Sequence, residues 1–173
     1  MISRYNHLTV LLLIFDAVFS SAAVCSPGWT NWKQSCYAMH SKRLNWMDAT
    51  KFCENTGSHI VVPNSQAEND FIWGLVMDRL EYASLPMGGV WIGCKRETAD
   101  SSFVCAEKTD FTNWTPGHPS AKVLCIVYGK GGNGTWRSNR CTNDSRRYVV
   151  CEMPNTAYCL TAGKNGRFVS GLP

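Results

Sequence analysis

The chain has 173 residues, a length that suits one domain and is too short for two. Hydrophobic residues make up 45% and charged residues 17%, which is enough apolar material for a packed core. Its formal net charge of +4 is well below that of a dedicated nucleic-acid-binding protein, so no nucleic-acid partner is predicted. Nine cysteines exceed what a reducing compartment usually tolerates, which argues against a cytosolic enzyme.

The N-terminal residues have the pattern of an export signal. A basic opening at Arg4 is followed by an apolar run over 8–19 and by small residues at 21–23. A membrane anchor is the alternative, but it needs about 20 unbroken apolar residues, and this run is shorter and contains Asp16. We therefore predict a secretory signal peptide over 1–23, no membrane span, and a secreted, extracellular protein.

The cysteine spacing predicts disulfides rather than a metal site. All nine cysteines lie beyond the predicted signal peptide, and no two of them are closer than eight positions. Zinc sites usually contain close Cys-x2-Cys or cysteine/histidine pairs, whereas the three histidines beyond the predicted signal peptide, His40, His59 and His118, are scattered along the chain. We therefore expect a disulfide framework with one thiol left over, no metal and no cofactor.

Two helices are predicted in the first half of the chain. Asn45 can cap a helix that runs to Gly57 and has one apolar face, made by Ala49, Phe52 and Cys53. Ser65 and Glu68 have the spacing of a capping box, in which each side chain bonds the other residue's exposed N–H. Apolar residues follow at helical spacing: Phe71, Ile72, Leu75, Val76 and Leu80.

Short strands are predicted after Pro86, separated by glycine, asparagine and serine. Their ranges are 90–95, 102–106, 123–128, 135–141 and 147–152. Helices followed by antiparallel strands indicate an α+β fold. The residues from 154 to 173 show little periodicity and are predicted to form a mobile tail.

Several short motifs resemble, in order and spacing, those of the C-type lectin-like domain family. They are Cys25-Ser26-Pro27-Gly28-Trp29, Ser35-Cys36-Tyr37, Trp91-Ile92-Gly93, Phe111-Thr112-Asn113-Trp114, Gly134-Thr135-Trp136 and Tyr148-Val149-Val150-Cys151-Glu152. The resemblance implies a C-type lectin-like fold over 24–153: two helices packed on antiparallel sheets, a long-loop region and a set of disulfides.

The resemblance also implies which cysteines pair. Three bridges follow from the family's positions: Cys25–Cys36, Cys53–Cys151 and Cys125–Cys141. Cys94 and Cys105 are additional to that set, and we predict that they pair with each other. Cys159 is then unpaired in the tail, where it either stays free or links two chains as a disulfide-bonded homodimer.

In the lectins of this family, a calcium ion bridges the protein and the sugar. Its ligands come from a Glu-Pro-Asn or Gln-Pro-Asp triplet, from an acidic residue before the third core cysteine, and from an Asn-Asp pair after a strand tryptophan. This chain has His118-Pro119-Ser120 at the triplet and Arg137-Ser138 after the tryptophan, and 111–143 contains no Asp or Glu. Because calcium needs six to eight oxygens, several of them carboxylates, we predict no calcium at the usual sugar-binding site.

The segment that would bind ligand is basic. The residues from 118 to 147 include six lysines and arginines but only one acidic residue, Asp144. Such side chains contact sulfate, phosphate or carboxylate groups, although a solvated basic face with no specific ligand is the alternative. The predicted ligand-binding residues are His118, Ser120, Lys122, Lys130, Arg137, Ser138 and Arg140.

Two asparagines in this half of the chain, Asn133 and Asn143, begin glycosylation sequons and are the predicted glycosylation sites. A glycan on Asn133 would crowd the predicted ligand face. The glycines of 129–134 have the spacing of a dinucleotide-binding motif, but no helix follows them, so they are interpreted as a turn. No catalytic motif has the context it needs, so we predict that the protein is not an enzyme.

Together these features predict a secreted lectin-like recognition module that binds extracellular carbohydrate, such as an acidic glycan or an anionic microbial surface. The alternative is a protein-binding or extracellular-matrix scaffold that has the same fold and binds no sugar. A toxin-like or anticoagulant protein is a third interpretation that also rests on this fold.

Overall fold

The computed structural model of the protein describes residues 25–80, 89–129 and 133–155. Cys25–Pro154 forms a single compact unit. The predicted signal peptide, most of the predicted tail with Cys159, and Lys130 lie outside the described residues. The elements in chain order are β1 (Thr30–Trp32), β2 (Ser35–Leu44), α2 (Trp46–Glu54), β3 (His59–Ile60), α3 (Gln66–Arg79), β4 (Trp91–Lys95), β5 (Val104–Cys105), β6 (Cys125–Tyr128), β7 (Trp136–Asn139) and β8 (Arg147–Pro154).

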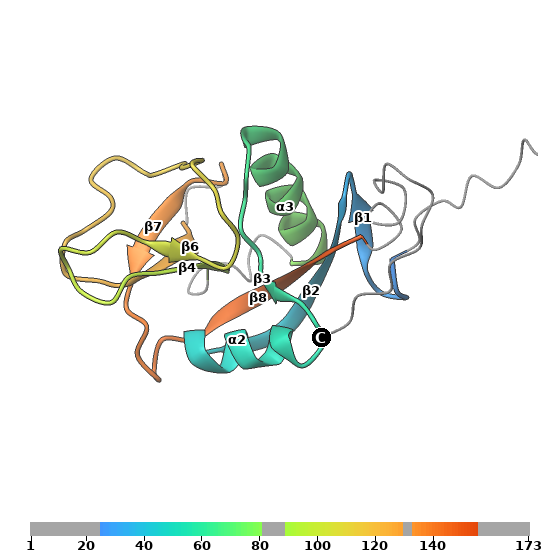
Figure 1. The fold of residues 1–173 in the computed structure, drawn as a ribbon, viewed down its shortest axis with the longest axis horizontal. Helices are drawn as coiled ribbons and strands as arrows, with labels where there is room; N and C mark the ends of the chain where they lie inside the picture. The colour runs from blue at the N-terminus through green and yellow to red at the C-terminus, as the bar shows by residue number, and fades with distance from the viewer. Residues whose placement is uncertain (1–24, 81–88, 130–132, 156–173) are drawn as a thin grey trace, which may run out of the picture. The chain divides into compact units, whose positions relative to one another are not determined.

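The strands form two antiparallel sheets (Figure 1). The first has the order β1-β2-β8-β3 and lies between α2 and α3, and the second has the order β5-β4-β6-β7. The long pairing of β2 with β8 brings the two ends of the unit together, with Tyr37 opposite Glu152. The α+β, C-type lectin-like fold predicted from the sequence is confirmed.

The first helix begins where its capping residue predicts. The side chain of Asn45 accepts a hydrogen bond from the backbone N–H of Asp48, which satisfies one of the exposed donors of the first turn. Ala49 and Cys53 are buried, as the apolar pattern predicts. The helix ends at Glu54, three residues before the predicted end at Gly57, and the chain then turns through Gly57 at positive φ.

The capping box of the second helix forms only in part. Ser65 accepts the backbone N–H of Glu68 at 3.2 Å, but Glu68 does not return the bond. Its carboxylate instead accepts the Asn64 N–H at 2.8 Å and the Tyr37 hydroxyl. The prediction of a reciprocal box is therefore wrong, because Tyr37 draws the carboxylate into the core, where Glu68 is 4% exposed.

The five predicted strands are present, with ends shifted by up to two residues. The pattern of apolar and polar residues did not predict β1 and β2, which precede the helices, or β3, which separates them. The ten residues of β2 are the longest of these strands. The only expectation for this region was the Cys25–Cys36 bridge that the resemblance implies. The sequence of β2 alternates poorly between apolar and polar residues, because its first part, at 36–38, is buried on both faces while 41–43 near its end are exposed.

Four disulfides are present in the described residues, and they are the four predicted pairs: Cys25–Cys36, Cys53–Cys151, Cys94–Cys105 and Cys125–Cys141. The Cys53–Cys151 bridge joins α2 to β8, and Cys94 lies directly opposite Cys105 in the β4–β5 ladder. Two further bridges close the N-terminal hairpin and the long-loop region. The core around them contains Trp91 and Trp136 as its largest fully buried side chains.

Candidate functional site

Three of the predicted ligand-binding residues meet in one hydrogen-bond network. The Ser138 hydroxyl, on β7, accepts the Ser120 N–H at 2.7 Å and lies 3.0 Å from Nδ1 of His118. The Ser138 N–H also donates to this Nδ1, at 3.2 Å, so Nδ1 is an acceptor and the imidazole carries its proton on Nε2. Ser138 is 8% exposed, which places the centre of the network inside the protein.

The network occupies the positions at which the resemblance places the sugar-bridging calcium ligands. Its polar groups are one imidazole nitrogen, the Ser138 hydroxyl and the backbone N–H groups of Ser120 and Ser138, and the neighbouring residue on β7 is Arg137. Calcium requires six to eight oxygen ligands with carboxylates among them. The residues at this site therefore do not fit calcium, and they satisfy one another instead. The His118–Pro119 peptide that leads into the network is cis.

Arg96, directly after β4, holds the same loop through its backbone. Its guanidinium donates to the carbonyl of Ser120 at 2.6 Å and twice to that of Val123, at 2.9 and 3.1 Å. The group lies 4.9 Å from the ring centroid of Phe103, and the residue is 7% exposed. Arg96 was not among the predicted site residues, because its only signal in the sequence is a charged residue placed next to a buried strand.

The remaining predicted ligand-binding residues are at the surface. Lys122 lies in the loop that Arg96 holds, and Arg137 and Arg140 lie on and just after β7; all three are exposed. The side chain of Arg137 runs across the backbone of Gly129, where a Cβ would come within 3.1 Å of it. Lys130 is outside the described residues.

The two predicted glycosylation sites are also exposed. The side-chain oxygen of Asn133 accepts a hydrogen bond from the hydroxyl of Thr135, the third residue of its sequon, at 2.9 Å. Asn143 lies in the turn between β7 and β8. Both therefore remain candidates for modification.

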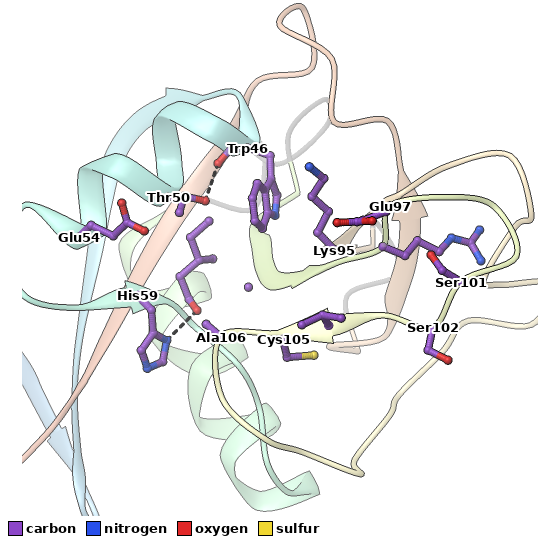
Figure 2. Close-up of a pocket in the computed structure, with 14 residues that line it drawn as sticks. Trp46, Thr50, Glu54, His59, Lys95, Glu97, Ser101, Ser102, Cys105 and Ala106 are labelled. Carbon is purple, nitrogen blue, oxygen red and sulfur yellow. Dashed lines mark hydrogen bonds between the residues drawn. The ribbon is translucent and has the colours of Figure 1, made fainter.

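A pocket of about 500 Å³ lies between α2 and the β4–β5 hairpin (Figure 2). The indole of Trp46 and the aliphatic side chain of Val104, which is 74% exposed, form part of its wall. Charged side chains stand around it: Glu54, His59, Lys95, Arg96 and Glu97. None of the six predicted ligand-binding residues that the structure describes lines this pocket.

A buried acidic network lies on the other side of β3. The Tyr37 hydroxyl donates to Glu68 and lies 3.0 Å from the carboxylate of Glu152, which also accepts the Val62 N–H at 3.2 Å. Glu152 is 1% exposed. Burial, together with the negative charges of Glu107 and Glu68, raises the pKa of Glu152 to about 7.

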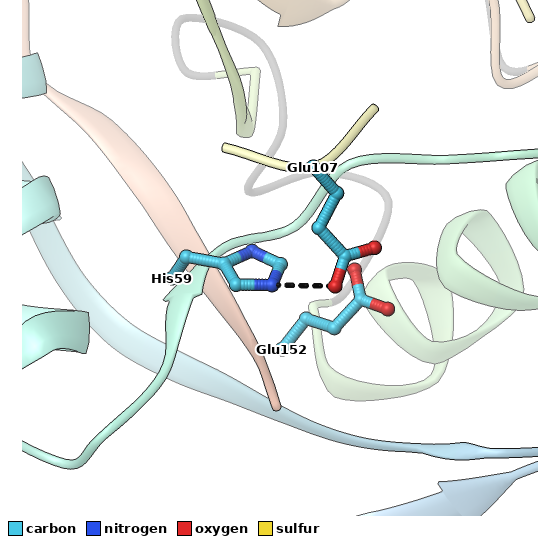
Figure 3. A group of neighbouring side chains, drawn as sticks. All are labelled: His59, Glu107 and Glu152. Carbon is cyan, nitrogen blue, oxygen red and sulfur yellow. Dashed lines mark hydrogen bonds and ion pairs between the residues drawn. The ribbon is translucent and has the colours of Figure 1, made fainter. Parts of the chain in front are cut away.

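His59 connects this network to the surface (Figure 3). Its Nε2 lies 3.0 Å from an oxygen of Glu107, in the segment after β5. Burial alone would lower the pKa of His59, but the hydrogen bonds to Glu107 and Ile60 and the nearby carboxylates raise it above its ordinary value. The hydrogen bond from His59 lowers the pKa of Glu107. No sequence signal connects His59, Glu107 and Glu152, because they are far apart in the chain.

The fold, the four bridges and the arrangement of the long loops define a C-type lectin-like domain. The Lectin C-type domain family matches residues 42–153, and the chain belongs to this family. Among the helices of the described residues, none is long and apolar enough to cross a membrane.

The relatives found by sequence include several snaclecs. A snaclec salmorin chain from Gloydius brevicauda is 31% identical over 147 residues, which cover 83% of this chain and 92% of the relative. A chain of the snaclec coagulation factor IX/factor X-binding protein from Gloydius halys has the same identity and coverage. The second name describes a binding protein rather than an enzyme.

Solved structures with the same fold include human lithostathine, with a TM-score of 0.67 at 22% identity over 75% of this chain and 99% of that chain. A calcium-independent type II antifreeze protein matches with a TM-score of 0.65 at 22% identity, over 76% of this chain and 95% of that one. These likenesses show the fold alone.

Proposed function

We propose that the protein is a secreted, non-enzymatic recognition module that binds acidic extracellular glycans without calcium. Lys122, Arg137 and Arg140 contact the sulfate or carboxylate groups, and Lys130 extends the same basic segment. His118, Ser120 and Ser138 shape the loop that carries these bases. The proposal includes export through the signal peptide at 1–23 and glycosylation at Asn133 and Asn143.

One observation supports the proposal most. Where the lectins of the family bind calcium, this chain has a hydrogen-bond network surrounded by exposed basic side chains. The loop keeps its conformation through Ser138 and through the buried guanidinium of Arg96, neither of which needs a metal. The segment 111–143 contains no carboxylate, and Asp144, directly after it, interacts with Arg140 but not with Lys122 or Arg137. An anionic ligand gains from these charges, and arginine adds two-pronged geometry.

A second candidate function is binding to a protein partner. It is favoured by the relatives, one of which is named for binding coagulation factors IX and X and is 31% identical over 83% of this chain. The same basic face would then meet an acidic protein surface. A homodimer linked through Cys159 belongs to this candidate as well.

The test compares two double variants that remove the same charge. Lys122→Ala/Arg137→Ala removes two bases from the long-loop face, and the matched control Lys33→Ala/Arg79→Ala removes two exposed bases from the β1–β2 turn and the end of α3. Binding to heparin and to an array of sulfated and neutral glycans is measured with calcium, with chelator, and over a range of salt.

The wild type and the control should bind sulfated glycans equally with and without chelator. Each ionic contact with a nucleic acid contributes about 0.7–0.9 to the slope of log K against log salt, so the test variant should lose about 1.5 from this slope. Equal binding by both double variants would refute the proposal that the basic long-loop face binds the glycan. If no glycan binds at all, binding to factors IX and X becomes the deciding measurement, and an unaffected Lys122→Ala/Arg137→Ala would then reject both candidates for this surface.

A further inference from the structure

Three possible metal-binding side chains meet at one point, away from the long loops. They are His59 on β3, Glu107 after β5 and Glu152 on β8 (Figure 3). One ligand atom from each lies within 4.8 Å of the other two. The bridge between Cys94 and Cys105 and the pairing of β3 with β8 hold the three segments in place.

The orientation of the imidazole is set by the backbone. Nδ1 of His59 lies 3.0 Å from the carbonyl oxygen of Ile60, and a carbonyl only accepts, so Nδ1 carries a hydrogen. In the neutral ring, Nε2 therefore has its lone pair directed at the oxygen of Glu107, 3.0 Å away. A lone pair facing a carboxylate is repulsive, so a cation belongs between them: either the proton of the imidazolium, which forms the hydrogen bond to Glu107 described above, or a metal ion that replaces this proton. A backbone carbonyl that fixes the tautomer in this way is the usual outer partner of a metal-binding histidine.

The two carboxylates are also held by outer partners. The Asn64 amide donates to Oε2 of Glu107 at 3.2 Å, and the Val62 N–H donates to Oε2 of Glu152 at 3.2 Å. Glu152 is 1% exposed and is directed into the cluster, whereas the side chains of His59 and Glu107 are 22% and 31% exposed. The cluster thus has a rigid inner wall and an outer side that an ion can reach from solvent.

We propose that His59, Glu107 and Glu152 bind one divalent transition-metal ion of the zinc class. One imidazole nitrogen and two carboxylates make a set of three protein ligands that suits Zn²⁺ with a water in the fourth position. Calcium is a poor fit because it needs six to eight oxygens. The site is separate from the basic long-loop face, and its occupation would tie β3 and the segment after β5 to β8.

The test titrates Zn²⁺ into the oxidised protein by calorimetry and records the visible absorption of the Co²⁺ form, which reports low-symmetry coordination with nitrogen. Both measurements use a Cys159→Ser background, so that the leftover thiol contributes nothing. The variants are His59→Gln and Glu107→Gln. Glu97→Gln is the matched control, because it removes a carboxylate from the adjacent pocket but not from the cluster.

One equivalent of Zn²⁺ should bind, and excess Ca²⁺ should not displace it. Loss of an outer partner alone typically weakens metal affinity by about 10–100-fold. We therefore expect the Zn²⁺ affinity of His59→Gln and of Glu107→Gln to fall at least about tenfold, and that of Glu97→Gln to stay unchanged. Glu107 is partly exposed, so Glu107→Gln keeps the fold and the test stays decisive if His59→Gln unfolds. No uptake of Zn²⁺ by the parent protein, or equal uptake by the parent and Glu107→Gln, would overturn the proposal.

Discussion

Replacing Arg96 with methionine should release the long loop while leaving the rest of the fold intact. Methionine has a similar length and fills the space against Phe103, but it has no donor for the carbonyls of Ser120 and Val123. The two carbonyls are then left without the guanidinium inside a part-buried loop. Arg96→Lys is the informative second variant, because it keeps the charge but not the forked geometry.

The size of the effect follows from the bonds lost. Hydrogen bonds from charged groups contribute about 1.5–3 kcal/mol each, and Arg96 makes three, at 2.6, 2.9 and 3.1 Å. Burial of the guanidinium offsets part of this gain, so we expect a net loss of about 3 kcal/mol, near the lower end for breaking a buried charged network. In a unit of this size, that loss lowers the melting temperature by about 10 °C.

Calorimetry measures the melting temperature, and limited trypsin digestion measures the loop itself. Lys122 lies between the two carbonyls that Arg96 holds, so its cleavage rate reports the opening of the loop. The fragments stay joined by Cys53–Cys151 and separate only after reduction. Cleavage at Lys33, in the β1–β2 turn, is the internal control. An unchanged melting temperature together with an unchanged ratio of cleavage at Lys122 to Lys33 would refute the role of Arg96.

Three further predictions concern the interior. Ser138→Ala removes the acceptor of the Ser120 N–H and should lower the free energy of unfolding by about 1–2 kcal/mol in denaturant titrations, with Ser138→Thr as the variant that keeps the hydroxyl. Gly93→Ala would place a Cβ 2.3 Å from the carbonyl oxygen of Ile60, so the secreted yield should fall sharply, and a normal yield would contradict this geometry. The raised pKa of Glu152, about 7 against an ordinary 4.5, means that the folded state holds a proton more tightly than the unfolded state. Its contribution of about 3 kcal/mol is full below about pH 4.5 and is lost as the pH rises to about 7. In chelator, the wild type should therefore lose stability over this range, and Glu152→Gln should lose much less.

Local signals predicted the parts of the structure that depend on neighbouring residues. Asn45 and Ser65 begin their helices because a side-chain oxygen two or three residues upstream of an exposed N–H can bond it in any context. The side chain of Glu68 does not follow its local pattern. Its carboxylate bonds the hydroxyl of Tyr37, 31 positions away, instead of the Ser65 N–H that the capping box predicts. Only the packed structure brings that hydroxyl within reach.

The candidate site shows the same division. The replacement of calcium ligands by His118, Ser120 and Ser138 was visible from their order in the chain, and the structure adds that Ser138 bonds both of the others. Arg96 carried no motif, because an arginine next to a strand is ordinary until the two carbonyls beside it are known.

The sequence by itself determined the α+β class, three of the four bridges through the family resemblance, the fourth through the two cysteines additional to the family's set, and the loss of the usual calcium ligands. These follow from residue types at fixed spacings, which do not change when the chain folds. The tertiary structure alone decided the internal support of the long loop by Arg96, the hydrogen bond between Tyr37 and Glu152, and the meeting of His59 with Glu107. Those features join residues from separate strands and loops, and a distance between separate segments is set by sheet pairing and packing rather than by position along the chain.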